Sequence, residues 1–189
     1  MSYTEMVCFN KKGKAESYKD VKNSWRGAMA IWSILEKKYL PQYRPSYVPN
    51  YIPNSMLESY CHYKPSRCAD LMNKDAMKEI WNLFNEANVN EIDKIVLGTT
   101  FDKVIVKKEN FPKIIDAFNK FEGKTSLKEQ AKVLEEMLKD DEIIAVAWNQ
   151  TSVNENQWTC HEFDEKNEEY IPYNYLKDNK HYELFDELK

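Results

Sequence analysis

Two cysteine–histidine pairs are the residues of this chain best suited to hold a metal ion. Cys61 precedes His62, Cys160 precedes His161, and Cys68 follows in the same region as the first pair. Thiolate sulfur and imidazole nitrogen are the ligands of tetrahedral zinc sites. The Cys-x6-Cys spacing differs from that of structural zinc sites, and neighbouring strand residues point to opposite faces. The pattern favours buried, unreactive thiols over a metal site or a cysteine–histidine nucleophile.

Carboxylates beside a predicted strand suggest a second chemistry. Asp102, Lys103 and Lys107 surround the apolar residues 104–106. A metal-dependent nuclease uses acids and a lysine on neighbouring strands to bind metal ions and activate water. No second predicted strand carries the Glu-x-Lys partner that such a site needs. A small metal-dependent hydrolase or nuclease is therefore an alternative interpretation of the chain.

An acidic tract near the C-terminus offers charge without an obvious catalytic arrangement. It comprises Glu162, Asp164, Glu165, Glu168 and Glu169, with one lysine among them. Such a tract can bind the basic surface of a partner or imitate the phosphates that a nucleic-acid enzyme recognises. It can also be a solvated acidic loop, which is the more common situation. Both interpretations are kept.

A Pro/Tyr-rich strap occupies residues 41–53. Proline recurs at every fourth position, and Tyr43, Tyr47 and Tyr51 each follow a proline by two residues. Repeated X-Pro steps exclude a helix and favour an extended backbone. Its tyrosines are predicted either to contact a partner, because such rings give large contact area at low entropic cost, or to pack on the protein's own helices.

The composition excludes several common functions. Only four glycines occur in 189 residues, and no GxGxxG, GxxxxGK[ST] or GxSxG window is present. We therefore expect no nucleotide cofactor and no acyl-transfer elbow. Only three of the 27 basic residues are arginines, which argues against sequence-specific DNA binding, because arginine forks read guanine edges.

Charge is distributed unevenly along the chain. Residues 1–68 hold 11 basic and 5 acidic residues, whereas residues 140–189 hold 4 basic and 13 acidic residues, in a chain whose formal net charge is -4. The basic and acidic parts can pair within the fold, or they can present two surfaces to partners.

Hydrophobic periodicity predicts an α+β fold, with several amphipathic helices packed on a small β-sheet and the extended strap between them. We expect one domain over residues 1–189, with a possible subdivision near 41–55. The predicted strands cover residues 6–9, 14–18, 104–106 and 143–148, the last at the centre of the sheet. The predicted helices cover residues 20–40, 73–87, 91–97, 111–121 and 126–138, with Ser126 opening the last as a capping box.

The chain is expected to be a soluble protein of a bacterial cytoplasm. Its first residues contain no basic segment followed by an apolar one, as a signal peptide would. The longest apolar run, residues 143–148, has six residues, against about 20 for a membrane-spanning helix.

Five segments together resemble uncharacterised proteins that phages and mobile elements carry in low-GC Gram-positive bacteria. They are residues 21–32 (VKNSWRGAMAIW), 100–110 (TFDKVIVKKEN), 125–132 (TSLKEQAK), 147–153 (AWNQTSV) and 179–188 (NKHYELFDEL). The strap and the cysteines that follow it fall outside the resemblance. The resemblance brings no catalytic motif and implies an accessory gene product acting in a bacterial cytoplasm.

These observations favour a non-enzymatic protein that binds and modulates or inhibits a host protein, with an antiviral-defence effector of the CRISPR type as the leading partner. The contact residues would be the strap tyrosines and the acidic tract. Besides the hydrolase or nuclease, a phage structural or assembly protein is the remaining alternative.

Overall fold

The computed structural model describes residues 3–23, 27–41, 48, 51–57, 74–150 and 156–188, and it confirms the α+β class. The strands are β1 (Tyr3–Asn10), β2 (Ala15–Lys22), β3 (Val104–Lys107), β4 (Ile143–Asn149), β5 (Glu162–Asp164), β6 (Glu169–Ile171) and β7 (Tyr182–Glu183). The α-helices of the described residues are α1 (Ala28–Tyr39), α3 (Lys74–Asn85), α4 (Glu91–Gly98), α5 (Phe111–Lys120), α6 (Leu127–Leu138) and α7 (Leu184–Glu187).

Five strands form a mixed sheet in the order β2-β1-β4-β3-β7. β1 pairs antiparallel with β2 and β4, β3 pairs antiparallel with β4, and β7 runs parallel to β3. The predicted central strand is thus β4, and its Ala145, Val146 and Ala147 are completely buried. A continuous apolar strand is buried on both faces, so β4 requires a packed layer on each side of the sheet.

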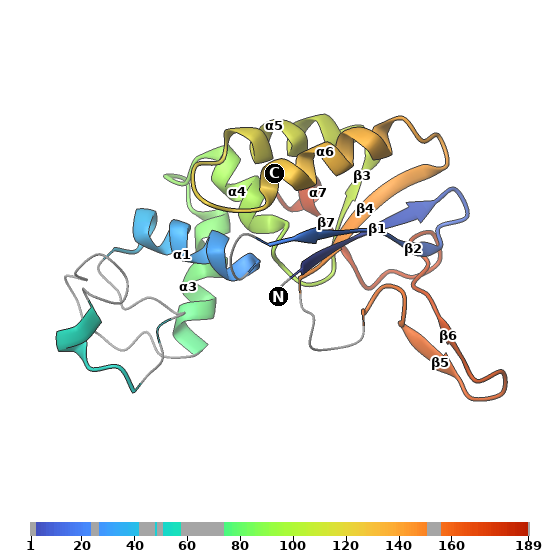
Figure 1. Ribbon diagram of the computed structural model, residues 1–189, viewed down its shortest axis with the longest axis horizontal. Coiled ribbons are helices and arrows are strands. Elements are labelled where there is room, and N and C mark those ends of the chain that lie inside the picture. Colours follow the sequence, from blue (N-terminus) through green and yellow to red (C-terminus); the bar gives the residue numbers. More distant parts are fainter. Residues whose placement is uncertain are drawn as a thin grey trace.

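Helices cover one face of the sheet (Figure 1). The residues that face inward from α5 and α6 follow the predicted helical spacing: Ile114, Phe118, Leu134 and Met137 all have no exposed surface. The Phe118 ring packs edge-on against the indole of Trp148 in β4, with centroids 6.1 Å apart. These contacts hold the helices on the sheet by burying apolar area.

The C-terminal segment covers the second face of the sheet. Trp158 and Tyr173 pack against Phe9 of β1, with ring centroids 5.7 Å and 6.4 Å from it, and they lie 5.2 Å from each other. The small side chains of Ala145 and Ala147 belong to the same buried cluster and leave room for the two large rings. This face is therefore a second, smaller core, made by aromatic side chains from beyond residue 155.

A chain of buried hydrogen bonds ties α6 to the sheet on the helical side. Trp148 Nε1 donates to Gln130 Oε1 over 3.0 Å, and Gln130 Nε2 donates to Ser126 Oγ over 3.0 Å. The Ser126 and Thr4 hydroxyls each donate to Asn23 Oδ1 over 2.9 Å. Buried polar groups must be paired in this way, since each unpaired one costs about 1–3 kcal/mol.

The capping-box prediction for Ser126 is wrong because of these bonds. Ser126 makes no side-chain hydrogen bond to the first turn of α6. Its hydroxyl is used instead for the tertiary contact with Asn23, which sequence spacing does not reveal.

The predicted helix over residues 20–40 is wrong at its beginning. Asp20, the first residue of that predicted helix, lies in β2 opposite Glu5, and pairing with β1 continues to Lys22. α1 begins only at Ala28, after Gly27, whose φ of 53° and ψ of -123° are not helical. Val21, near the start of the predicted helix, is buried in the core, but it reaches the core from a strand.

None of the helices of the described residues combines the length and apolar character that crossing a membrane requires.

Replacement of Trp158 by alanine is expected to destabilise the protein strongly. The substitution removes a side chain that is 1% exposed, and such large-to-small changes lower the free energy of unfolding by about 3–5 kcal/mol. Chemical denaturation followed by circular dichroism measures it. The matched control is Trp81→Ala, because Trp81 is 47% exposed and its removal should cost about half as much or less. If the two variants lose equal free energy of unfolding, Trp158 is not part of a second core.

Candidate functional site

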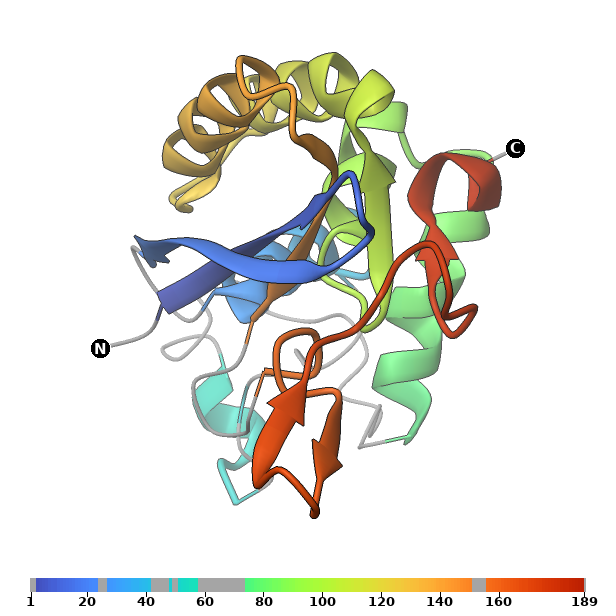
Figure 2. The same ribbon diagram turned by 90° about the vertical axis from the view of Figure 1, so that its right-hand side faces the viewer.

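The acidic tract forms a two-stranded hairpin. β5 and β6 pair antiparallel, with Glu162 opposite Ile171, Phe163 opposite Tyr170 and Asp164 opposite Glu169. The hairpin projects away from the helices and the main sheet, as the orange ribbon in Figures 1 and 2 shows. The tract is therefore an ordered projection rather than an irregular loop.

Strand alternation divides the hairpin into two chemically different faces. Residues that lie opposite each other share a face, and adjacent residues of one strand do not. One face carries the acids Glu162, Asp164 and Glu169 together with the exposed Ile171, and we call it the acidic face. The other carries Phe163 and Tyr170, whose rings meet edge-on 5.1 Å apart while remaining 53% and 44% exposed. We call this pair the aromatic face.

The turn of the hairpin is organised by one of the predicted acids. The Asp164 carboxylate accepts hydrogen bonds from the backbone N–H groups of Lys166 (2.9 Å) and Asn167 (3.3 Å), and from Asn167 Nδ2 (2.7 Å). These donors lower the pKa of Asp164, the Asn167 side chain contributing most. Glu168 then takes a left-handed φ of 53°. Asp164 is thus a positioning residue of the turn.

The other acids of the tract are directed to solvent. Within the described residues, Glu165, Glu168 and Glu169 make no ion pair, and Glu162 lies 3.8 Å from His161 Nε2. Some lysines of the basic N-terminal part pair elsewhere, as Lys11 does with Glu142 and Lys19 with Glu136, each over 3.2 Å. Among the described residues, the acids at the tip of the hairpin are therefore not neutralised by ion pairs.

The base of the hairpin continues into the second core. Ile171 O accepts the N–H of His161 over 3.1 Å, and Trp158 O accepts the N–H of Tyr173 over 2.6 Å. The strands of the hairpin thus leave the body between two buried aromatic residues. This anchoring positions the charged tip relative to the sheet.

A groove of about 480 Å³ lies beside this base. Its lining includes Lys12, Lys14 and Lys177 together with the acids Glu162 and Asp178. Because Glu162 shares this groove with lysines, acids predominate only on the part of the hairpin farther from its base.

The structure describes only part of the predicted strap. Tyr43 and Tyr47 lie outside the described residues, whereas Tyr51 is 80% exposed. Val48 and Ile52 are buried in a small cluster with Leu57. In the described part, aliphatic residues pack inward and the tyrosine faces solvent, so a contact role for the strap tyrosines stays a prediction.

The metal prediction can be followed only in part. Cys61, His62 and Cys68 lie outside the described residues. Within the described ones, no three His, Cys, Asp or Glu side chains gather where they could hold a metal ion. Cys160 and His161 are half-buried.

The nuclease-like residues do not converge in the described part of the chain. Lys107 lies 3.8 Å from Glu183, and Asp102 is exposed in the turn before β3. The thiol of Cys8 is buried, and burial raises its pKa to about 11, so it is protonated and a poor nucleophile at neutral pH.

The sequence reasoning missed the apolar residues of the hairpin. Phe163, Tyr170 and Ile171 are exposed beside the acids. The signal was present as two short alternating stretches, Glu-Phe-Asp and Glu-Tyr-Ile, separated by the polar residues Glu165 to Glu168. Such stretches indicate a hairpin, but the density of charge favoured the loop interpretation.

Comparison of the chain with protein-family models, curated protein sequences and solved structures finds no match. The fold and the hairpin are therefore interpreted from their own chemistry.

Acidification is expected to lower the stability of the C-terminal layer, which covers the second face of the sheet and carries the hairpin. Tyr173 Oη accepts the Lys180 N–H and lies 2.8 Å from His181 Nδ1, so we assign its hydroxyl as the donor to a neutral imidazole. Burial lowers the pKa of His181 below the ordinary value of 6.5. The unfolded chain then takes up this proton more readily than the folded one, so the stabilisation is complete above pH 6.5 and decreases as the pH falls below it.

Melting temperatures measured from pH 8 to pH 5 test this assignment. The wild-type protein should lose more stability over this range than His181→Gln, which has no proton to bind there. If the melting temperatures of the two proteins fall equally as the pH is lowered, protonation of His181 is not coupled to folding.

Proposed function

We propose that this chain is a non-enzymatic binding protein that docks its hairpin on a basic surface of a host protein and thereby modulates or inhibits it. The observation that carries the proposal is the acidic hairpin, an ordered projection whose tip acids make no ion pair with a described residue and whose other face carries an exposed aromatic pair.

The charge arrangement supports a cationic partner. Asp164 and Glu169 lie directly opposite each other, and like charges in this position destabilise a strand pair by about 0.2–1 kcal/mol. A basic partner would remove this repulsion on binding. Acidic surfaces also accelerate association with basic ones, which makes them suitable for capture of a host protein.

The aromatic face would supply the apolar part of the contact. Aromatic side chains are enriched among the residues that dominate binding energies. Phe163 and Tyr170 lie on the face opposite the acidic face, so a partner that binds the acids of the turn would bury these rings by extending along the aromatic face.

The partner class follows from the same chemistry. Proteins that handle nucleic acid carry grooves of lysine and arginine that bind phosphate. A row of carboxylates can occupy such a groove and exclude the nucleic acid. In the setting that the resemblance to phage and mobile-element accessory proteins implies, we propose an antiviral-defence effector of the CRISPR type as this host protein.

Charge reversal of the hairpin is expected to abolish partner capture. The tagged chain should co-purify one stoichiometric partner from the lysate of a low-GC Gram-positive host. Glu165→Lys, Glu168→Lys and Glu169→Lys together should weaken binding to the purified partner at least about 100-fold, or about 2.7 kcal/mol. With a purified CRISPR effector as the partner, the wild-type chain should slow DNA cleavage and the triple variant should not.

The matched control reverses three exposed acids elsewhere, Glu122, Glu129 and Glu135, and so changes the net charge equally. This variant should retain binding. Retention of the partner by the hairpin variant, or equal loss in both variants, would contradict docking through the hairpin.

A further inference from the structure

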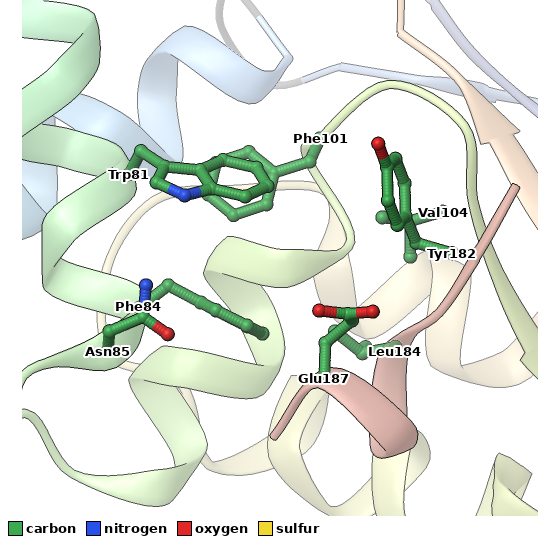
Figure 3. Close-up of a pocket in the computed structure, with 8 residues that line it drawn as sticks. All are labelled: Trp81, Phe84, Asn85, Phe101, Val104, Tyr182, Leu184 and Glu187. Carbon is green, nitrogen blue, oxygen red and sulfur yellow. The ribbon is translucent and has the colours of Figure 1, made fainter. Parts of the chain in front are cut away.

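A second surface feature lies between α3 and the C-terminal end of the chain. It is a cavity of about 160 Å³ that opens to solvent. Its walls come from three separate parts of the sequence, as Figure 3 shows. α3 provides Trp81, Phe84 and Asn85, the turn and strand after α4 provide Phe101 and Val104, and β7 with α7 provides Tyr182, Leu184 and Glu187.

Four of the lining residues are aromatic. Trp81 stacks on Phe101 with centroids 4.5 Å apart and a tilt of 41°, and Phe84 meets Phe101 nearly edge-on at 5.7 Å. Trp81 and Tyr182 remain 47% and 50% exposed. Large rings are normally buried more completely, so these two are held at the opening with part of each ring accessible to a ligand.

A carboxylate completes the cavity. In Figure 3 the carboxylate of Glu187 points from α7 toward the space bounded by the rings of Trp81, Phe84 and Tyr182. Among the side chains that the structure describes, no lysine, arginine or histidine lines the cavity. Glu187 makes no ion pair with any of them. The negative charge that faces the cavity therefore has no cation beside it among the described residues.

The local packing maintains this arrangement. Gly98, the last residue of α4, lies against Leu184 and Phe84, and a Cβ there would come within 2.2 Å of Leu184 Cδ1 and 3.0 Å of Phe84 Cε2. The missing side chain at Gly98 lets α7 and α3 approach the same point of α4. This approach brings Glu187 to the rings.

We infer that this cavity is a binding site for an alkylammonium group, such as a quaternary ammonium compound or the end of a lysine side chain. The faces of aromatic rings attract cations through their quadrupole, and several rings around one cation form the aromatic cages that recognise choline and methylated lysine. A carboxylate at the edge adds direct charge attraction. The inference does not depend on the proposed role of the hairpin, which shares none of these residues.

Titration with small cations tests the inference. The indole N–H resonance of Trp81, assigned by its loss in Trp81→Leu, is followed while choline, butylammonium or N-acetyl-lysine amide is added. The neutral choline isostere 3,3-dimethyl-1-butanol is the reference ligand. The cations should shift the resonance with millimolar affinity and bind at least tenfold more tightly than the neutral isostere. The order among the three cations distinguishes a free quaternary ammonium from a lysine side chain.

Two variants separate the ring and charge contributions. Glu187→Gln keeps the shape of the cavity and should weaken cation binding about fivefold, while Glu122→Gln, an exposed carboxylate elsewhere, should leave it unchanged. Tyr182→Leu keeps apolar area without a ring and should weaken binding further. Equal binding of the neutral isostere, no shift with any cation, or no effect of Glu187→Gln would overturn the inference.

Discussion

The burial of β4 on both faces is the constraint on which the rest of the structure depends. Its apolar run needs cover on two sides, and the helices supply only one layer. The second layer is provided by Trp158 and Tyr173 from the C-terminal segment. Because these two residues must lie on the sheet, the chain between them has to leave the body and return. The short stretch between the anchors is the acidic hairpin.

The same C-terminal segment contributes to every feature that we consider functional. After Tyr173 it pairs β7 with the edge strand β3, and α7 then packs against α4 at Gly98. Covering the sheet edge prevents unpaired backbone groups from meeting other chains. β7 also carries Tyr182, and α7 carries Glu187, so the pairing of β7 with β3 builds one wall of the aromatic cavity. Stability and binding chemistry are combined in one segment.

The hairpin and the cavity favour ligands of the same charge. The hairpin presents carboxylates beside exposed rings, and the cavity presents rings beside a carboxylate. In both proposals the bound group is positively charged, because carboxylates repel phosphates. They also agree with the 13 acidic and 4 basic residues of the last part of the chain, residues 140–189. Both proposals therefore name a positively charged ligand or partner.

The sequence by itself determined the class of fold, the central strand and most helices, because hydrophobic spacing directly reflects burial. It also identified the acidic residues of the hairpin, since composition reveals charge. Only the tertiary structure decided that residues 20–22 belong to a strand, because pairing with β1 prevails over helical spacing there. It also decided that the Ser126 hydroxyl donates a hydrogen bond to Asn23. Likewise, Trp81, Phe101 and Glu187 are ordinary residues in the sequence. They form a cavity because the sheet closes with β7 and Gly98 allows α7 close approach, and such long-range contacts leave no local pattern.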